Sequence, residues 1–244
     1  MEALCQGGGI VQALNTHVYG NGTQTLVLAH GFGSDHTVWH FLIPFPACYF
    51  KVVVFDWVYS PNVDPKFYDP KRYSNFSAYA DDLVCLLNHL NVSRTVYMGH
   101  SMAAMVGCIA SIQRPHLFQH LILLKNNFTN WVSSSATTAI GVNDTSAITE
   151  FENILGRMKP RIAVSVARVA FLSDYRGLLP QVIVPCSIIQ SRKDFIIPKS
   201  VAFYMKKQLR GPAKVKILST EGHIPQLTAY SLLLKVIKKL LHIK

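Results

Sequence analysis

Residues 96–107 read VYMGHSMAAMVG, and this stretch predicts a strand, a sharp turn and a helix in direct succession. Ser101 lies at the turn, two positions after Gly99 and two positions before Ala103. A serine in this G-x-S-x-small spacing is typical of a nucleophile elbow, where a strained turn exposes the serine hydroxyl at the N-terminus of a helix. The alternative is a helix-capping serine that happens to follow a glycine.

Ala103 occupies the position where the usual elbow pattern has a second glycine. The residues two before and two after the serine must be small, because the strand and helix backbones approach closely there. Alanine adds one methyl group and needs no positive φ inside a helix, so we expect it to be tolerated. A match of this kind in isolation is weak evidence, and the assignment of Ser101 depends on the rest of the chain.

Strand-like apolar runs alternate with helical patterns along the chain, which predicts a mostly parallel, doubly wound sheet with helices on both faces. The strand-like runs are residues 25–30, 49–56, 94–98, 120–124, 186–190 and 214–218, and the clearest helical patterns are residues 77–90 and 228–242. We find no linker or repeat that would divide the chain, so we expect a single domain over residues 1–244. In such sheets, ligands bind at the carboxyl ends of the strands.

Two further side chains follow strand ends and complete a catalytic set with Ser101. Asp194 follows the strand-like run 186–190, and His223 lies in a loop between the run 214–218 and the final helix. A serine hydroxyl needs a base to accept its proton and an acid to orient that base. The chain order Ser101, Asp194, His223 is the order found in α/β-hydrolases.

The sequence also offers an oxyanion hole and two competitors for catalytic roles. After the first strand, HGFG can supply the backbone N–H of Phe32, and the helix start can supply the N–H of Met102. His100 is a competing base, but as the serine's direct neighbour it is expected to contact substrate from the pocket wall. Asp174 is a competing acid that we rank below Asp194, because FLSDYR reads as part of a helical stretch.

Composition bounds the remaining possibilities. Half of the residues are hydrophobic and 15% are charged, which predicts a packed core and excludes a disordered chain. The net charge of +11 comes from scattered basic residues without zinc-ligand spacing or a nucleic-acid signature. We therefore predict no specific nucleic-acid binding and no metal.

No apolar run is long enough to insert into a membrane. Five cysteines without a C-x-x-C pair predict reduced thiols in a cytosolic protein.

Several strings together resemble the strigolactone and karrikin receptors of plants, a branch of the RsbQ-like α/β-hydrolases, and look closest to their DWARF-like paralogues. The strings are AHGFGSDHTVWH, DPKRYSNFSAYADDL, GHSMAAMVGCIASIQRPHLF, VPCSIIQSRKDFIIP and EGHIPQLT. The resemblance covers nearly the whole chain. It implies an α/β-hydrolase fold, the triad Ser101, Asp194 and His223, an oxyanion hole at Phe32 and Met102, and no metal or organic cofactor.

The chain departs from this family in the helical lid, an insertion that we place at approximately residues 125–172. The sequence NNFTNW resembles the end of the second lid helix, while residues 146–158 and 160–172 resemble the third and fourth. The first lid helix and most of the second are absent, which predicts a truncated lid. Residues 131–141, WVSSSATTAIG, replace a stretch that in the family offers an aromatic side chain to the pocket. Trp131 remains as a predicted substrate-contacting residue, but its aromatic partner is missing.

Two functions follow from these observations. The first is a serine hydrolase of small esters or butenolide lactones with a strigolactone- or karrikin-type receptor role. By resemblance, this role includes an F-box signalling partner and a location in the cytoplasm and nucleus. The second is a catalytically impaired ligand-binding protein that retains the hydrolase core. The complete triad favours the first function, and the shortened lid favours the second.

Overall fold

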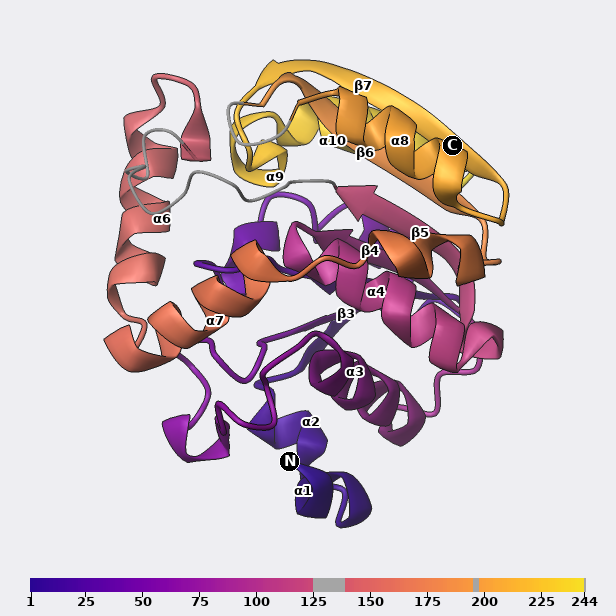
Figure 1. Cartoon of the computed structure of the whole chain (residues 1–244). Helices are drawn as coiled ribbons and strands as arrows, with labels where there is room; N and C mark the ends of the chain where they lie inside the picture. Colours follow the sequence, from indigo (N-terminus) through magenta and orange to yellow (C-terminus); the bar gives the residue numbers. More distant parts are fainter. Residues whose placement is uncertain (125–138, 195–197, 244) are drawn as a thin grey trace.

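The structure is a computed structural model, and it describes residues 1–124, 139–194 and 198–243. Within this part of the chain, seven strands form one sheet in the order β1-β3-β2-β4-β5-β6-β7 (Figure 1). β1 pairs with β3 antiparallel, and all the other pairs are parallel. The predicted mostly parallel sheet is therefore confirmed. The strands are β1 (His17–Tyr19), β2 (Thr25–Ala29), β3 (Lys51–Phe55), β4 (Thr95–His100), β5 (Phe118–Leu124), β6 (Cys186–Lys193) and β7 (Ala213–Glu221).

The central strands are apolar throughout because both of their faces are buried. All five residues of β2 are buried, and in β3 only Lys51 is not fully covered. Alternate residues of these strands enter two separate cores. Val27 and Val53 pack on one face of the sheet, and Leu26 and Val52 on the other. A doubly wound arrangement follows from this two-sided burial.

Helices cover both faces of the sheet. One face packs against α1 (Glu2–Gln6), α2 (Ile10–Ala13), α3 (Ser77–His89), α4 (Met102–Gln113) and α8 (Ser200–Gln208). The other packs against the short 3₁₀ helix η1 (His36–Trp39), α9 (Pro225–Thr228) and α10 (Tyr230–Leu240). The predicted last helix, residues 228–242, corresponds to α10. The remaining 3₁₀ helices are η2 (Pro46–Cys48), η3 (Pro65–Phe67), η4 (Pro115–Leu117) and η6 (Arg176–Gln181).

Two further helices, α6 (Thr145–Gly156) and α7 (Pro160–Leu172), lie to one side of the sheet, at the left of Figure 1. They correspond to the predicted third and fourth lid helices. Residues 125–138, which include the start of the predicted lid insertion, lie outside the described residues. The division into one domain with a lid at residues 125–172 therefore stays a prediction.

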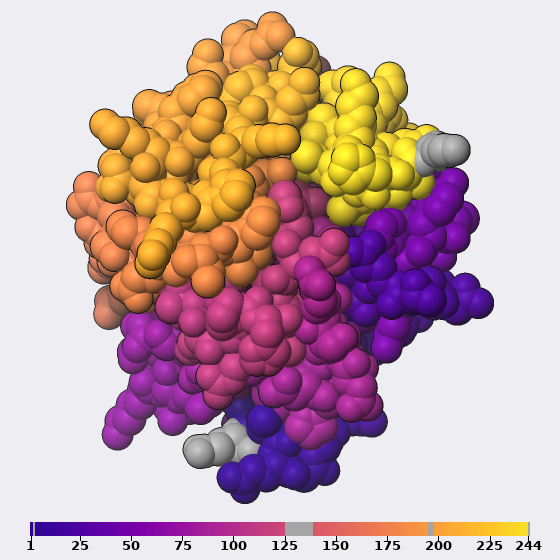
Figure 2. All heavy atoms as spheres, turned by 90° about the vertical axis from the view of Figure 1, so that its right-hand side faces the viewer, coloured from indigo at the N-terminus to yellow at the C-terminus, as the bar shows by residue number. Residues whose placement is uncertain are grey.

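The densest group of basic residues lies on α8 and the edge strand β7, whose orange and gold atoms adjoin yellow α10 in Figure 2. Lys206 and Lys207 are exposed on α8, and Lys214 and Lys216 are exposed on β7. Lysines on an edge strand discourage pairing with another sheet, so this group has a structural explanation. Within the described residues, no helix is long and apolar enough to cross a membrane.

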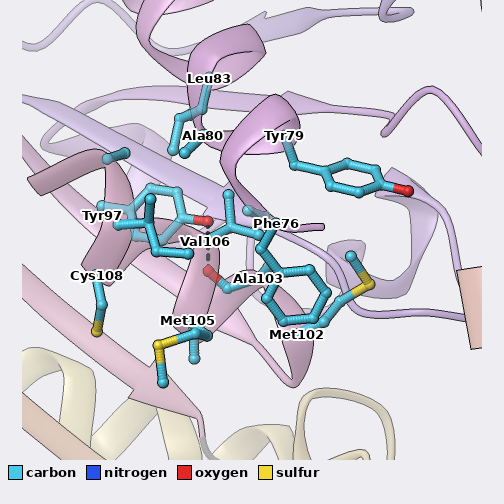
Figure 3. Packing of buried hydrophobic residues seen from close by; sticks show 14 of the residues in the cluster. Phe76, Tyr79, Ala80, Leu83, Tyr97, Met102, Ala103, Met105, Val106 and Cys108 are labelled. Carbon is cyan, nitrogen blue, oxygen red and sulfur yellow. Dashed lines mark hydrogen bonds between the residues drawn. The ribbon is translucent and has the colours of Figure 1, made fainter. Parts of the chain in front are cut away.

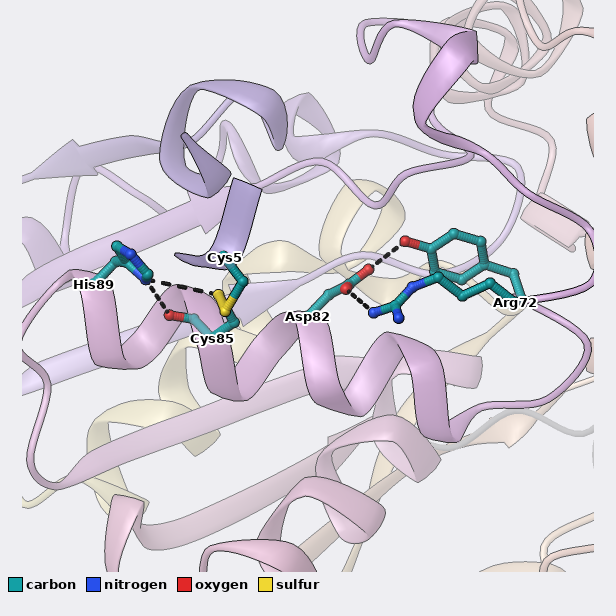
Figure 4. The surroundings of a disulfide bond; sticks show 6 residues. Cys5, Arg72, Asp82, Cys85 and His89 are labelled. Carbon is teal, nitrogen blue, oxygen red and sulfur yellow. Dashed lines mark hydrogen bonds and ion pairs between the residues drawn. A yellow bond between two sulfur atoms is a disulfide. The ribbon is translucent and has the colours of Figure 1, made fainter. Parts of the chain in front are cut away.

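A disulfide joins Cys5 on α1 to Cys85 on α3 (Figure 4). The expectation that all five cysteines are reduced thiols is therefore wrong for this pair, whereas Cys48 and Cys186 are free. The two cysteines are 80 residues apart, so no local sequence spacing predicts that they pair. They meet because α1 packs across α3. On the same helix α3, the buried carboxylate of Asp82 forms an ion pair with Arg72.

Replacing Cys5 with serine is expected to lower the free energy of unfolding by about 3 kcal/mol, because a cross-link over 80 residues restricts the unfolded chain. Urea unfolding followed by circular dichroism measures the change. Cys48→Ser, at an exposed free cysteine, is the matched control and should leave the midpoint unchanged. Equal midpoints for the Cys5→Ser variant and the parent protein without reductant would show that the disulfide does not stabilise the fold.

Candidate active site

Ser101 occupies the turn between the end of β4 and the start of α4. Its backbone has φ 60° and ψ −125°, a conformation that a non-glycine residue rarely adopts. The neighbouring structure holds this turn in place, because the Ser101 N–H donates to the carbonyl oxygen of Leu124 at 2.9 Å. The predicted strand, strained turn and helix are therefore present, and the serine is not an ordinary capping residue, since its side chain makes no cap hydrogen bond.

Close packing around the turn explains the small residues of the motif. A Cβ on Gly99 would lie 2.6 Å from the carbonyl oxygen of Ala103, and a Cβ on Gly31 would lie 2.7 Å from the Cβ of Ser101. Ala103 itself is fully buried inside α4, and its carbonyl oxygen accepts a hydrogen bond from the Tyr97 hydroxyl at 2.8 Å (Figure 3). Alanine therefore fits at position 103, whereas the glycines at 31 and 99 have no room for a side chain.

His223 lies in the loop between β7 and α9, where backbone hydrogen bonds fix its position. The His223 N–H donates to the carbonyl oxygen of Ala139 at 2.8 Å, and the Gly222 N–H donates to that of Lys193 at 2.8 Å. Gly222 has φ 83°, and a Cβ there would lie 1.8 Å from the carbonyl oxygen of Ile140. The loop that carries the predicted base thus needs glycine directly before the histidine, a requirement that sequence reasoning missed.

Asp194 follows β6 and faces His223, as the chain order predicts. Each of its carboxylate oxygens lies 3.5 Å from Nδ1 of His223, and both side chains are almost completely buried. The amide of Gln190 donates to the same carboxylate at 3.2 Å. Gln190 was not singled out from the sequence, although its place four residues before Asp194 near the end of β6 marks it as a neighbour of the acid.

Ser101 Oγ is buried and makes no hydrogen bond within the described part of the chain. The structure therefore brings Asp194 and His223 together but does not close the hydrogen bond between base and nucleophile. Such bonds are often long in proteins without substrate and shorten when a substrate binds. The three side chains remain a predicted triad on this geometry.

The predicted oxyanion-hole residues flank Ser101. Phe32 follows Gly31, whose backbone packs directly on the Ser101 side chain, and its own ring is buried. Met102 is the first residue of α4, so its N–H is among the amides that a helix leaves without an intrahelical acceptor. Both residues are thus near the serine along the chain or in space, and their role as oxyanion donors stays a prediction.

His100 is placed against the His223 loop. Its Nε2 lies 3.0 Å from the His223 carbonyl oxygen, and the two rings are 5.3 Å apart. Burial, with a smaller contribution from His223, lowers the pKa of His100 to about 3, so its ring is neutral at physiological pH. This geometry favours support of the His223 loop, and the predicted contact with substrate stays a prediction. Trp131, the other predicted substrate-contacting residue, lies outside the described residues.

A cavity of about 640 Å³ extends from Ser101 between α4, α7, η6 and α8. Its lining is mostly apolar or aromatic and includes Met102, Met105, Phe171, Leu172, Leu179 and Met205. Pockets for small ligands usually measure ~300–1,000 Å³ and have apolar walls with a few polar groups. The cavity is therefore suited to a small hydrophobic molecule whose reactive group reaches the serine.

Asp174, the competing acid, also borders this cavity, but it lies in the loop between α7 and η6. The expectation that it belongs to a helical stretch is wrong, because α7 ends at Leu172. Its exposed carboxylate accepts hydrogen bonds from the Arg176 side chain at 2.6–2.9 Å, and these bonds lower its pKa to about 2. Asp174 is thus paired with Arg176, whereas Asp194 faces the histidine.

Comparison with known proteins shows which family the chain resembles. Residues 24–146 match the family described as the alpha/beta hydrolase fold. The chain is 39% identical over 256 positions to strigolactone esterase RMS3 of Pisum sativum, covering 93% of this chain and 96% of that protein. It is 38% identical to karrikin insensitive 2 receptor CA of Petunia hybrida, covering 96% and 98%. A solved structure of a hydrolase from Oleispira antarctica superimposes with a TM-score of 0.90 at 25% identity, covering 97% of both chains.

The alignment with the Pisum sativum esterase has 256 positions, more than the 244 residues of this chain. Part of that relative therefore has no counterpart here, as a shortened insertion would require. The similar identities to an esterase and to a karrikin receptor do not assign the chain to either branch. The chain belongs to the α/β-hydrolase family, in the group that includes the strigolactone esterases and the karrikin receptors.

Proposed function

We propose that this protein is a serine hydrolase of small esters and butenolide lactones, with a receptor role for ligands of the strigolactone or karrikin type. The observation that carries the proposal is Ser101 on a strained elbow that lines a largely apolar cavity. Asp194 and His223, which face each other after β6 and β7, supply the acid and the base that such a serine needs. Membership in a group that includes strigolactone esterases supports the same chemistry.

The reaction begins when Ser101 Oγ attacks the carbonyl carbon of the ester while His223 accepts the hydroxyl proton. The backbone N–H groups of Phe32 and Met102 donate to the oxygen that becomes negative in the tetrahedral intermediate. When the C–O bond breaks, His223 returns the proton to the leaving alcohol. Water then attacks the acyl-serine by the same route and releases the acid. Asp194 holds His223 in the tautomer that both proton transfers require.

A catalytically impaired receptor is the second candidate, and one observation favours it. Ser101 Oγ has no hydrogen-bond partner in the described part of the chain, so the base is not already engaged with the nucleophile. Under this alternative, the apolar cavity binds the ligand and a signalling partner recognises the complex. An F-box protein is the partner that we propose in either case.

The proposal includes a location in the cytoplasm and nucleus and no specific binding of nucleic acid. The Cys5–Cys85 disulfide is unusual for that location, because cytosolic and nuclear thiols are normally kept reduced. We explain the exposed lysines of β7 by protection of the sheet edge and those of α8 as a solvated helix face, without a nucleic-acid partner.

Assays with two ligands of different size are expected to separate the functions. We expect measurable hydrolysis of p-nitrophenyl acetate but only weak binding of a large tricyclic butenolide, because a shortened lid covers less of a large ligand. About 100 Å² of uncovered apolar ligand surface corresponds to roughly 2.5 kcal/mol of binding free energy, more than tenfold in affinity. Stopped-flow absorbance measures hydrolysis, and titration calorimetry measures butenolide binding.

A fluorophosphonate probe, mapped by peptide mass spectrometry, should modify Ser101 in the same preparation. Butenolide binding without hydrolysis or labelling would select the impaired receptor, and the absence of all three would refute both functions. Nanomolar butenolide affinity would show that the shortened lid does not weaken ligand binding.

A further inference from the structure

The loop that follows β2, residues 31–35, carries Phe32 at its second position and ends at Asp35; we call it the oxyanion loop. Asp35 is completely buried, and so is Asp56 at the end of β3. The side-chain amide of Asn62 donates to Asp35 at 3.0 Å and to Asp56 at 3.1 Å, so the two carboxylates lie side by side. Two buried carboxylates are costly unless donors and positive charge compensate them.

The donors to Asp56 come from the core. The backbone N–H of His36 donates to it at 2.7 Å, and the side-chain amide of Asn15 donates at 2.7 Å. His36 Nδ1 lies 3.1 Å from the same carboxylate. Burial by itself would lower the pKa of His36. The hydrogen bond to Asp56 and the negative charge of Asp56 nevertheless raise it. Asp56 is therefore satisfied without any residue from the lid.

Asp35, unlike Asp56, has an ion-pair partner from the lid. Its carboxylate accepts hydrogen bonds from the backbone N–H and hydroxyl of Thr37, but its ion-pair partner is Arg157, at 2.8 Å. Arg157 directly follows α6, and its second terminal nitrogen donates to the side-chain oxygen of Asn62 at 3.1 Å. One guanidinium group thus bridges the end of the oxyanion loop and Asn62, in the segment that follows β3. A fork of this kind fixes orientation as well as charge.

The same lid helices also contact the middle of the oxyanion loop. Gly33 has φ 79°, and a Cβ there would lie 3.2 Å from the Phe151 ring and 3.4 Å from Leu155, both on α6. The ring of Phe171, on α7, meets the Phe32 ring edge-on at 6.4 Å between centroids. Lid residues therefore touch the oxyanion loop at positions 32, 33 and 35. The packing at Gly33 and the ion pair at Asp35 come from the same helix.

We infer that α6 positions the oxyanion loop and that Arg157 is a positioning residue that acts through Asp35 on the Phe32 backbone N–H. The inference rests on the proposed hydrolase function. An oxyanion donor stabilises the transition state only when it is correctly placed before the reaction, and a small displacement reduces the rate. The shortened lid thus has a second task besides covering the ligand: it keeps the core loop in its active position.

The test compares Arg157→Gln with Arg161→Gln, the latter at an exposed arginine on α7. The rate of each preparation is divided by the concentration of active sites, which is measured by titration with a fluorophosphonate. Unfolded protein therefore does not lower the measured kcat. For p-nitrophenyl acetate we expect Arg157→Gln to lower kcat by about tenfold with KM changed less than twofold. Arg157→Lys should recover part of the loss, because it keeps the charge but loses the fork. Arg161→Gln should match the parent protein.

A double-mutant cycle and a transition-state mimic make the test specific. In the Asp35→Asn background, Arg157→Gln should cost little further activity, because the partner through which Arg157 acts is already changed. An aryl trifluoromethyl ketone, whose adduct with the serine places an oxyanion in the hole, should bind about tenfold more weakly to Arg157→Gln, in parallel with kcat.

The outcomes separate this inference from the proposed function. A parent protein that neither hydrolyses the ester nor reacts with the fluorophosphonate contradicts the proposed function. An active parent protein with unchanged kcat in Arg157→Gln overturns the inference alone. Lower stability with unchanged kcat per titrated site would show a purely structural role and would overturn it too. If Arg157→Gln does not fold, the Arg157→Lys and Asp35→Asn variants provide the same comparison.

Discussion

Replacing Ser101 with alanine is expected to lower turnover of p-nitrophenyl acetate by about 10⁴-fold or more, since the nucleophile of a serine hydrolase acts together with its base as one unit. Any residual rate would come from the oxyanion hole and from substrate binding. The Ser101 side chain makes no hydrogen bond within the described residues, so its removal breaks no observed polar contact. We therefore expect a folded variant with nearly parental melting temperature.

Ser111→Ala provides the matched control for this prediction. Ser111 is also a buried serine near α4's other end, and its hydroxyl donates to the Cys108 carbonyl oxygen at 2.7 Å. This variant should retain parental kcat. Stopped-flow hydrolysis with purified protein measures both variants. Near-parental activity in the Ser101→Ala variant would show that another group is the nucleophile and that the elbow has a different role.

Replacing Asp194 with asparagine is expected to lower kcat by roughly 10³–10⁴-fold with little effect on the fold. Asparagine keeps the shape of the side chain, but its amide N–H can stabilise the tautomer of His223 in which Nδ1 is the acceptor. The base would then hold its proton on Nε2, where the serine proton must be received. The buried carboxylate beside Nδ1, at 3.5 Å, is the structural basis for this expectation.

Asp174→Asn is the matched control, because Asp174 borders the same cavity but pairs with Arg176. Its carboxylate is exposed, so we expect less than a threefold change in kcat when the charge is removed. Steady-state kinetics on the same ester compares the two variants. A larger loss from Asp174→Asn than from Asp194→Asn would make Asp174 the catalytic acid and would reverse our assignment.

Local sequence patterns were sufficient for the elbow because the constraint there is steric and short-range. Gly99 and Ala103 approach each other within a few residues of chain, so the motif itself records the close contact. The parallel sheet was predictable for a similar reason. Strands buried on both faces, such as β2 and β3, must be apolar throughout, and this produces unbroken runs in the sequence.

The order of residues along the chain also predicted which side chains meet at the carboxyl edge of the sheet, because parallel strands bring their following loops to the same edge. His223 and Asp194 are 29 residues apart, yet their strands β6 and β7 are neighbours. The role of Asp174 was less accessible. Its apolar neighbours suggested a helix. In the structure, α7 ends at Leu172, and Asp174 lies in the following loop, where it forms an ion pair with Arg176.

The sequence by itself determined the fold class and the proposed triad, since each depends on local periodicity or on residues that follow predicted strands. Only the tertiary structure revealed the Cys5–Cys85 disulfide and the contact of Arg157 with Asp35, whose partners are 80 and 122 residues apart. Neither pair has a local signature. A cysteine on a short helix and an arginine after a lid helix are compatible with many partners. The partner is chosen by the packing of whole helices, α1 across α3 and α6 over the oxyanion loop, and no window of sequence contains both sides of those contacts.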